Sequence, residues 1–273
     1  MRPFSTAFRT IRGAQPVRAA AAPEGVTLYA VGDVHGRLDL LDALLRHVRS
    51  DALVSEGHKI LVMLGDYIDR GPRSDQVIAR LLAMRADPLL ETVCLRGNHE
   101  QTLLDFLDDP AIGPAWMRHG GGATLSAYGV EPPARTADLN AWQATAERLA
   151  WAIPDSHRRF LQQTSLSYEA GDYLFAHAGV RPGVGWASQT TDDLLSIREP
   201  FLSSVRPIPG RVVVFGHTPA DAPRLEAGKI GLDTGAYASN LLTGVRLSGT
   251  RRLLFQAELD PIRSERTIGL VPA

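Results

Sequence analysis

Five short motifs in this chain place an aspartate, asparagine or histidine directly after an apolar stretch. They are GDVHG (32–36), GDYIDRG (65–71), RGNHE (96–100), HAG (177–179) and GHT (216–218). Buried carboxylates and imidazoles are normally paired, hydrogen-bonded or bound to metal. Each motif alone has an ordinary explanation, since Gly-Asp and Gly-Asn form turns and helix caps and a single strand-end histidine is commonly a hydrogen-bonded core residue. Five such motifs in one chain instead predict one shared site.

The oxygen and nitrogen donors of these motifs are typical ligands of divalent first-row metals. Carboxylate, carboxamide and imidazole groups suit Mn²⁺, Fe²⁺ or Zn²⁺, and the lack of thiolate ligands argues against a structural zinc or iron–sulfur site. Six candidates are too many for one catalytic ion with open positions, so two ions roughly 3.5–4 Å apart, sharing a carboxylate, are expected. The candidates are Asp33, His35, Asp66, Asn98, His177 and His217.

Strand-like and helix-like segments alternate through the first part of the chain. The expected strands are 26–31, 59–64 and 92–95, and the expected helices are 38–48, 74–84 and 99–107. Repeated strand–loop–helix units predict right-handed βαβ connections on a mostly parallel sheet. Ligands of such sheets bind beyond the carboxyl ends of the strands, which is where the motifs stand.

The middle of the chain has a different pattern. Residues 110 to about 163 show no clear strand but carry helical periodicity, which predicts a helical insertion. Strands then resume, over 165–169, 172–176, 211–215, 229–232, 241–247 and 251–258. The fold class expected is α/β, with two stacked mixed β-sheets flanked by helices. We expect a single domain over 26–273.

Composition excludes several classes of protein. Lys and Arg total 29 against 30 Asp and Glu among 273 residues, so no nucleic-acid partner is expected. No apolar run is long enough to span a membrane. The single cysteine, Cys94, excludes an internal disulfide, and its apolar surroundings predict a buried small hydrophobe.

The first 25 residues form a separate segment in the sequence. Four arginines precede the first acidic residue, Glu24, among alanines and prolines. This composition favours a disordered basic extension, with a targeting peptide or a membrane-surface anchor as the alternative. We expect a cytoplasmic protein.

The five motifs, taken in order, resemble those of the phosphoprotein phosphatase family of dinuclear metallophosphatases, serine/threonine-phosphatase type. The resemblance covers about residues 28–247. The stretch WMRHGGGATLSAY (116–128), with HAGVRPG and LLSIRE, is similar to the bacterial, phage-lambda-like members. The family implies a four-layer α/β/β/α sandwich and two metal ions, Mn²⁺ first, with iron or Zn²⁺ as alternatives. It implies that Asp33, His35 and Asp66 hold the first ion, and that Asp66, Asn98, His177 and His217 hold the second.

The resemblance also implies the residues that act on the substrate. Arg70, Arg96 and Arg198 would contact phosphoryl oxygens, and His99, oriented by Asp69, would be the general acid for the leaving group. The chemistry of the residue types agrees, because a guanidinium matches phosphate geometry and a carboxylate partner fixes a histidine tautomer.

Two further residues, one inside the motifs and one outside them, have less direct roles. We expect Glu100 to cap the helix that follows it. Tyr237, in DTGAYASN, either borders the site or serves as packing.

The predicted function is that of a dinuclear-metal-dependent phosphoesterase. Its substrates would be phosphoproteins (Ser/Thr, with Tyr open) or small phosphomonoesters, hydrolysed by direct attack of metal-bound hydroxide. The alternative is a diadenosine tetraphosphate hydrolase that uses the same metals. A non-catalytic scaffold is disfavoured, since no ligand of the motif set is missing.

Overall fold

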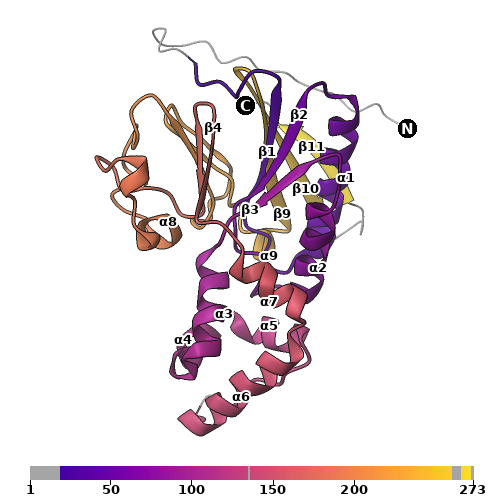
Figure 1. Ribbon diagram of the computed structural model, residues 1–273, viewed down its shortest axis with the longest axis vertical. Coiled ribbons are helices and arrows are strands. Elements are labelled where there is room, and N and C mark those ends of the chain that lie inside the picture. The colour runs from indigo at the N-terminus through magenta and orange to yellow at the C-terminus, as the bar shows by residue number, and fades with distance from the viewer. Residues whose placement is uncertain (1–18, 135, 260–265, 272–273) are drawn as a thin grey trace.

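The computed structural model describes residues 19–134, 136–259 and 266–271. Two mixed β-sheets lie face to face, and helices cover their outer sides (Figure 1). The predicted fold class is therefore confirmed. Among the described residues, no helix is both long and apolar enough to cross a membrane.

The first sheet has the order β11-β10-β9-β1-β2-β3. Its strands are β1 (Val26–Val31), β2 (His58–Met63), β3 (Glu91–Cys94), β9 (Leu241–Ser248), β10 (Arg251–Leu259) and β11 (Arg266–Val271). Strands β1, β2 and β3 run parallel, with α1 (Leu38–Val54) and α2 (Ser74–Arg85) between them. The other three strands pair antiparallel. The expected βαβ units are present, and their carboxyl ends share one edge.

The second sheet has the order β4-β5-β6-β8-β7. Its strands are β4 (Ser167–Ala170), β5 (Tyr173–Ala176), β6 (Val212–Phe215), β7 (Arg224–Leu225) and β8 (Lys229–Gly231). Strands β5, β6 and β8 run parallel. The short helices η2 (Trp186–Ser188), α8 (Thr191–Ser196) and α9 (Ala236–Ser239) lie in the loops that follow these strands.

The core has a layer on each side of the first sheet. In β1, Leu28 and Ala30 pack between the sheets, whereas Tyr29 and Val31 pack toward α1. A strand that is apolar on both faces is typical of a parallel sheet covered on both sides. Cys94 is buried, as expected.

Replacing Leu44 by Ala should lower the free energy of unfolding by about 2–5 kcal/mol, because it leaves a cavity in the layer between α1 and the sheet. Leu44 is fully buried. Leu53 of the same helix is 69% exposed, so Leu53→Ala should change the free energy by no more than about 0.5 kcal/mol. Chemical denaturation of both variants measures the difference. Equal effects would show that this face of α1 is not core.

A helical segment lies below the two sheets in Figure 1. It consists of α3 (Asn98–Asp108), η1 (Pro110–Ile112), α4 (Gly113–Arg118), α5 (Gly121–Ala127), α6 (Leu139–Ala152) and α7 (Asp155–Gln162). Within 110–162, leaving out residue 135, the described chain contains helices and no strand. Helix α3 begins at the RGNHE motif, so this segment adjoins the predicted site.

The expected basic extension, residues 1–25, falls mostly outside the described residues, which begin at residue 19. The part that is described is not disordered. The Ala21 amide donates to Asp172 Oδ2 at 3.0 Å, and the Ala22 amide donates to the Gly249 carbonyl at 2.9 Å. Ala22 is also buried against the core between the sheets. The packed part of the chain thus includes residues 21 and 22, whose alanine side chains are small enough to pack there. The boundary at residue 25 stays a prediction.

Candidate active site

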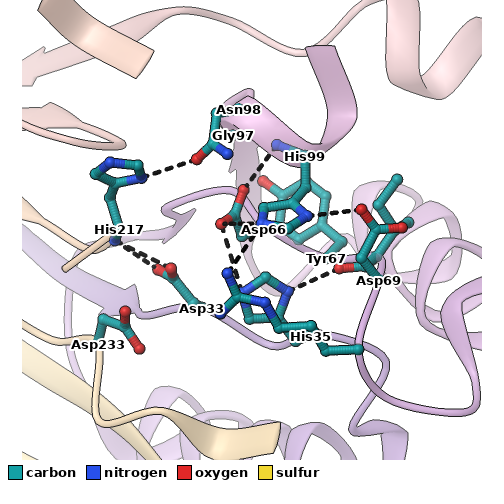
Figure 2. A network of polar contacts seen from close by, with 12 residues as sticks. Asp33, His35, Asp66, Tyr67, Asp69, Gly97, Asn98, His99, His217 and Asp233 are labelled. Carbon is teal, nitrogen blue, oxygen red and sulfur yellow. Dashed lines mark hydrogen bonds and ion pairs between the residues drawn. The ribbon is translucent and has the colours of Figure 1, made fainter. Parts of the chain in front are cut away.

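Parallel strands from both sheets deliver the predicted site residues to one region. Asp66 lies at its centre, with His99 and Asp69 on one side and Asn98 and His217 on the other (Figure 2). The residues follow five strands, β1, β2, β3, β5 and β6, which end before Asp33, Asp66, Asn98, His177 and His217 respectively. The structure thus brings together the side chains that the motifs singled out.

Two groups of potential metal ligands share Asp66. His35, Asp66 and His99 form one, and Asp66, His177 and His217 form the other; in each, one ligand atom per residue lies within 4.8 Å of the rest. Burial by itself raises the pKa of Asp66, but the neighbouring imidazoles outweigh it and lower that pKa. A carboxylate between two donor groups has the position of a bridging ligand.

Two imidazoles direct a lone pair at the Asp66 carboxylate. His35 and His177 each donate Nδ1–H to a backbone carbonyl, that of Ile68 at 2.8 Å and that of Leu64 at 2.9 Å. Burial lowers the pKa of His35 to about 3 and also lowers that of His177, which favours the neutral ring with its lone pair on Nε2. These Nε2 atoms lie 3.5 and 3.4 Å from the oxygens of Asp66. Facing lone pairs repel, so the arrangement fits a cation between them.

Asn98 and His217 complete the second group. Asn98 Oδ1 lies 3.0 Å from His177 Nε2 and 2.8 Å from His217 Nδ1. Burial, followed by the charge of His177, lowers the pKa of His217 to about 3. A carboxamide oxygen, a carboxylate and two neutral imidazoles are a suitable donor set for Mn²⁺, Fe²⁺ or Zn²⁺.

Asp33 lies among further buried carboxylates. It accepts a hydrogen bond from the His217 amide at 3.0 Å. Burial and the charges of Asp233 and Asp66 raise its pKa well above the usual range. Figure 2 shows the Asp33 carboxylate between those of Asp233 and Asp66. Buried carboxylates this close together are favourable only when protons or cations neutralise them.

Asp233 is a site residue that sequence reasoning missed. It follows β8, in LDTG, as the other acidic residues follow their strands. Burial raises its pKa to about 6, and its Oδ1 accepts the Gly235 amide at 2.8 Å. The signal that could have found it is similar to the one used elsewhere: an aspartate that comes within a few residues of the end of a strand, with a glycine close by.

His99 and Asp69 form a buried pair at one side of Asp66. His99 Nδ1–H donates to Asp69 Oδ2 at 2.6 Å. Burial lowers the pKa of His99, but the charges of Asp66 and Asp69 and the hydrogen bond to Asp69 outweigh it and raise the pKa to about 9. Arg70 Nη2 lies 3.2 Å from the other nitrogen, Nε2. The Arg70 guanidinium also lies over the Tyr237 ring, 4.5 Å from its centre, so Tyr237 borders the site.

Backbone strain is concentrated in the same loops. The described non-glycine residues with positive φ are His35, Asp66, Asp69, Arg70, His217 and Asn240, all but the last in the site. Such conformations persist only where surrounding bonds fix them, and they cluster at functional sites. Glycine is also required beside the ligands: a Cβ on Gly97 would lie 2.1 Å from Asp66 Oδ1, and one on Gly216 would lie 2.0 Å from Asp33 Oδ1.

The family model for calcineurin-like phosphoesterases matches residues 26–239, which include all five motifs. The chain belongs to the calcineurin-like phosphoesterase family. The protein is therefore a hydrolase of phosphate esters, and its predicted activity as a metal-dependent phosphatase is confirmed at that level.

Relatives of this phosphoesterase differ in their named substrates. It is 26% identical over 242 residues to the asymmetrical bis(5'-nucleosyl)-tetraphosphatase PrpE of Bacillus subtilis, covering 79% of this chain and 88% of that one. It is 29% identical over 226 residues to serine/threonine-protein phosphatase 1 of Salmonella typhimurium, covering 81% and 91%. A cold-active protein-tyrosine phosphatase of a Shewanella species has the same fold, with a TM-score of 0.54 at 16% identity over 91% and 83% of the chains.

The predicted phosphate-binding arginines of the phosphoesterase have different surroundings. Arg198 lies near His177 and His217, where its charge adds to the effect of burial on their pKa values. The Arg96 guanidinium instead donates to Thr164 Oγ1, Gln101 Oε1 and the Gln162 carbonyl. The structure brings Arg70 and Arg198 to the ligand groups and directs Arg96 to the segment 161–164. Phosphate binding by Arg96 stays a prediction that requires these bonds to break.

Glu100 organises the loop that carries Asp66. Its carboxylate accepts the amides of Asp66, Tyr67, Ile68 and Gly97, at 2.8, 2.8, 3.3 and 2.9 Å. The bond from Gly97 caps α3, which confirms the expected role. The other bonds join the GDYIDRG and RGNHE motifs, an effect that the sequence did not predict.

Replacing Glu100 by Gln should lower the free energy of unfolding by about 2 kcal/mol at pH 8, because the amide NH₂ then faces backbone N–H donors. Burial raises the pKa of Glu100 to about 7, so pH 8 keeps the carboxylate ionised in the parent protein. Urea denaturation with chelator present measures the change. Glu147→Gln, at an exposed position of α6, is the control. Equal stability of the two variants would contradict this role.

Proposed function

We propose that this phosphoesterase is a dinuclear-metal enzyme that hydrolyses phosphomonoesters, with phosphorylated protein side chains as its main substrates. The observation that carries the proposal is the position of Asp66 between two ligand groups, beside the buried pair of His99 and Asp69. This arrangement supplies the ligands, a phosphate-binding cation and a proton donor within one site.

The two ions would be held by different residues that share Asp66. We assign Asp33, His35 and Asp66 to the first ion, and Asp66, Asn98, His177 and His217 to the second, with Mn²⁺ as the expected metal. His99 lies in a ligand group but is not assigned to it. Its Nδ1 is bonded to Asp69, and the Arg70 guanidinium 3.2 Å from its Nε2 would repel a metal ion there.

The protein side chains have separate tasks in the proposed reaction. When bound, the metals would activate a water for in-line attack and neutralise charge on the phosphoryl group. Arg70 and Arg198 would bind the phosphoryl oxygens. A phosphoryl oxygen bound between Arg70 and His99 could accept a hydrogen bond from each. It would thereby separate two donor groups that otherwise face each other at 3.2 Å. His99, fixed by Asp69, would donate its proton to the departing oxygen, so that the leaving group departs neutral.

The named activities of two relatives support two classes of substrate. The serine/threonine-protein phosphatase of Salmonella typhimurium supports phosphoprotein as the substrate. A second candidate, hydrolysis of dinucleoside polyphosphates, is supported by the tetraphosphatase of Bacillus subtilis. Both use attack at phosphorus, so the same ligands, arginines and proton donor serve either substrate.

A comparison of substrates tests the proposal. The purified protein with Mn²⁺ is given a phosphoserine or phosphothreonine peptide, a phosphotyrosine peptide, p-nitrophenyl phosphate and diadenosine tetraphosphate. We expect the highest kcat/KM for a phosphopeptide. A higher kcat/KM for diadenosine tetraphosphate would replace the first candidate with the second, and no turnover of any phosphate ester would contradict both.

A further inference from the structure

Asp69 is held by side chains of α4 and α5, here called the α4–α5 segment (residues 113–127). Trp116 Nε1–H donates to Asp69 Oδ2 at 2.8 Å, the oxygen that also accepts His99 Nδ1–H. Thr124 Oγ1–H donates to the other oxygen, Oδ1, at 2.5 Å. Asp69, Trp116 and Thr124 are all fully buried. Hydrogen bonds from buried neutral donors to a carboxylate are strong and directional.

We propose that Trp116 and Thr124 are positioning residues for His99, acting through Asp69. The inference rests on the proposed role of His99 as proton donor. A carboxylate bonded only to the imidazole could rotate about its Cβ–Cγ bond. With Trp116 on one oxygen and Thr124 on the other, the carboxylate plane is fixed, and so is the direction in which His99 presents Nε2. The α4–α5 segment is then part of the catalytic machinery rather than a neighbour of it.

The backbone of the same loop is held by the same segment. Asp69 and Arg70 have φ values of 69° and 67°, which L-residues rarely adopt. The Asp69 amide donates to Thr124 Oγ1 at 2.9 Å and to Ser74 Oγ at 3.1 Å, and the Arg70 amide donates to the Gly120 carbonyl at 3.1 Å. The amides of two consecutive strained residues therefore donate to the α4–α5 segment, and these bonds keep both side chains directed into the site.

Two glycines where α4 leads into α5 permit this close packing. Gly120 has a φ of 101°, and a Cβ there would lie 2.7 Å from Arg70 Cγ. A Cβ on Gly121 would lie 2.5 Å from the Trp116 ring. The HGGG sequence at 119–122 thus lets the segment approach both Arg70 and Trp116. Simple core packing of Trp116 would not require the hydrogen bond to Asp69, and this difference can be tested.

The test uses leaving groups that differ in their need for a proton. 2,4-Dinitrophenolate departs without protonation, whereas phenolate needs a proton donor. We expect Trp116→Phe and Thr124→Val to lower kcat for phenyl phosphate by about tenfold or more, as a part of the roughly 10²–10⁴-fold effect of general acid catalysis. For 2,4-dinitrophenyl phosphate the fall should stay within about twofold. Thr124→Ser, which keeps the hydroxyl, should retain more of the rate than Thr124→Val.

Trp142→Phe is the matched control. Trp142 is also a buried tryptophan of the helical segment, and its Nε1 has no hydrogen-bond partner among the described residues. The control removes the same atoms without removing a bond, so it should leave both rates within about twofold. Near-UV circular dichroism of all variants verifies that they fold.

His99→Asn is the reference that separates this inference from the proposed function. If His99→Asn lowers both rates equally, His99 is not the proton donor, and the proposed role and the inference fail together. If His99→Asn is selective for phenyl phosphate but Trp116→Phe and Thr124→Val lower both rates equally, or lower neither, only the positioning role is overturned. Selective loss in all three variants supports the inference.

Discussion

Asp66→Asn should lower turnover of p-nitrophenyl phosphate by about a thousandfold in the presence of Mn²⁺, because metal catalysis contributes several kcal/mol and each 1.36 kcal/mol is about tenfold in rate. Asp66 belongs to both ligand groups. An amide in its place has one oxygen and no charge, so it would fail to bridge two cations. Steady-state kinetics together with metal analysis of the dialysed protein measure both effects.

Asp69→Asn provides the contrast for this prediction. Asp69 is bonded to His99, Trp116 and Thr124 and to none of the assigned ligands. We therefore expect Asp69→Asn to keep the metal content of the parent protein while the release of a poor leaving group slows. The assignment of the site would be wrong if both variants, Asp69→Asn and Asp66→Asn, kept the full metal content and the turnover of the parent protein.

His99→Asn should reduce kcat for phenyl phosphate by about 10²–10⁴-fold, the usual contribution of a positioned general acid. His99 and Asp69 are both buried, so bulk water has little access to the pair and would replace the lost proton donor incompletely. The metals should stay bound, since His99 is not among the assigned ligands. Kinetics with phenyl phosphate and metal analysis of the same sample measure the change.

His157→Asn is the control for this substitution. His157 is a buried histidine of α7 whose Nδ1 lies 2.9 Å from the Tyr128 hydroxyl. It belongs to neither ligand group, so its replacement should leave turnover within about twofold. A comparable loss in both variants would indicate damage to the helical segment rather than loss of a proton donor. Unchanged turnover in His99→Asn would contradict the mechanism.

The site was predictable from the sequence where local patterns carry it. Strands β1, β2, β3, β5 and β6 are each followed within four residues by a donor residue that has a glycine near it, and parallel strands place their carboxyl ends together. The six ligand candidates therefore meet without any knowledge of the packing. Asp233 could have been predicted by the same rule, because it follows β8 as the other donor residues follow their strands.

Other features depend on contacts between distant segments and leave no local signal. Arg96 precedes Asn98 in the sequence, but its amide donates to the Ser165 carbonyl at 2.7 Å, which aligns its side chain with the segment 161–164. The bonds of Trp116 and Thr124 to Asp69 exist only because the α4–α5 segment packs on the GDYIDRG loop. Strand β11 was also missed: it pairs with β10 in the structure.

Electron paramagnetic resonance of the Mn²⁺-loaded protein tests the central claim most directly. If Asp66 bridges two ions about 3.5–4 Å apart, metal analysis should give two ions per chain and the spectrum should show exchange coupling between them. Asp66→Asn should abolish that coupling. Two results would contradict a bridging Asp66. One is a fully loaded parent protein whose spectrum shows magnetically independent ions, and the other is a fully loaded protein that holds a single ion per chain.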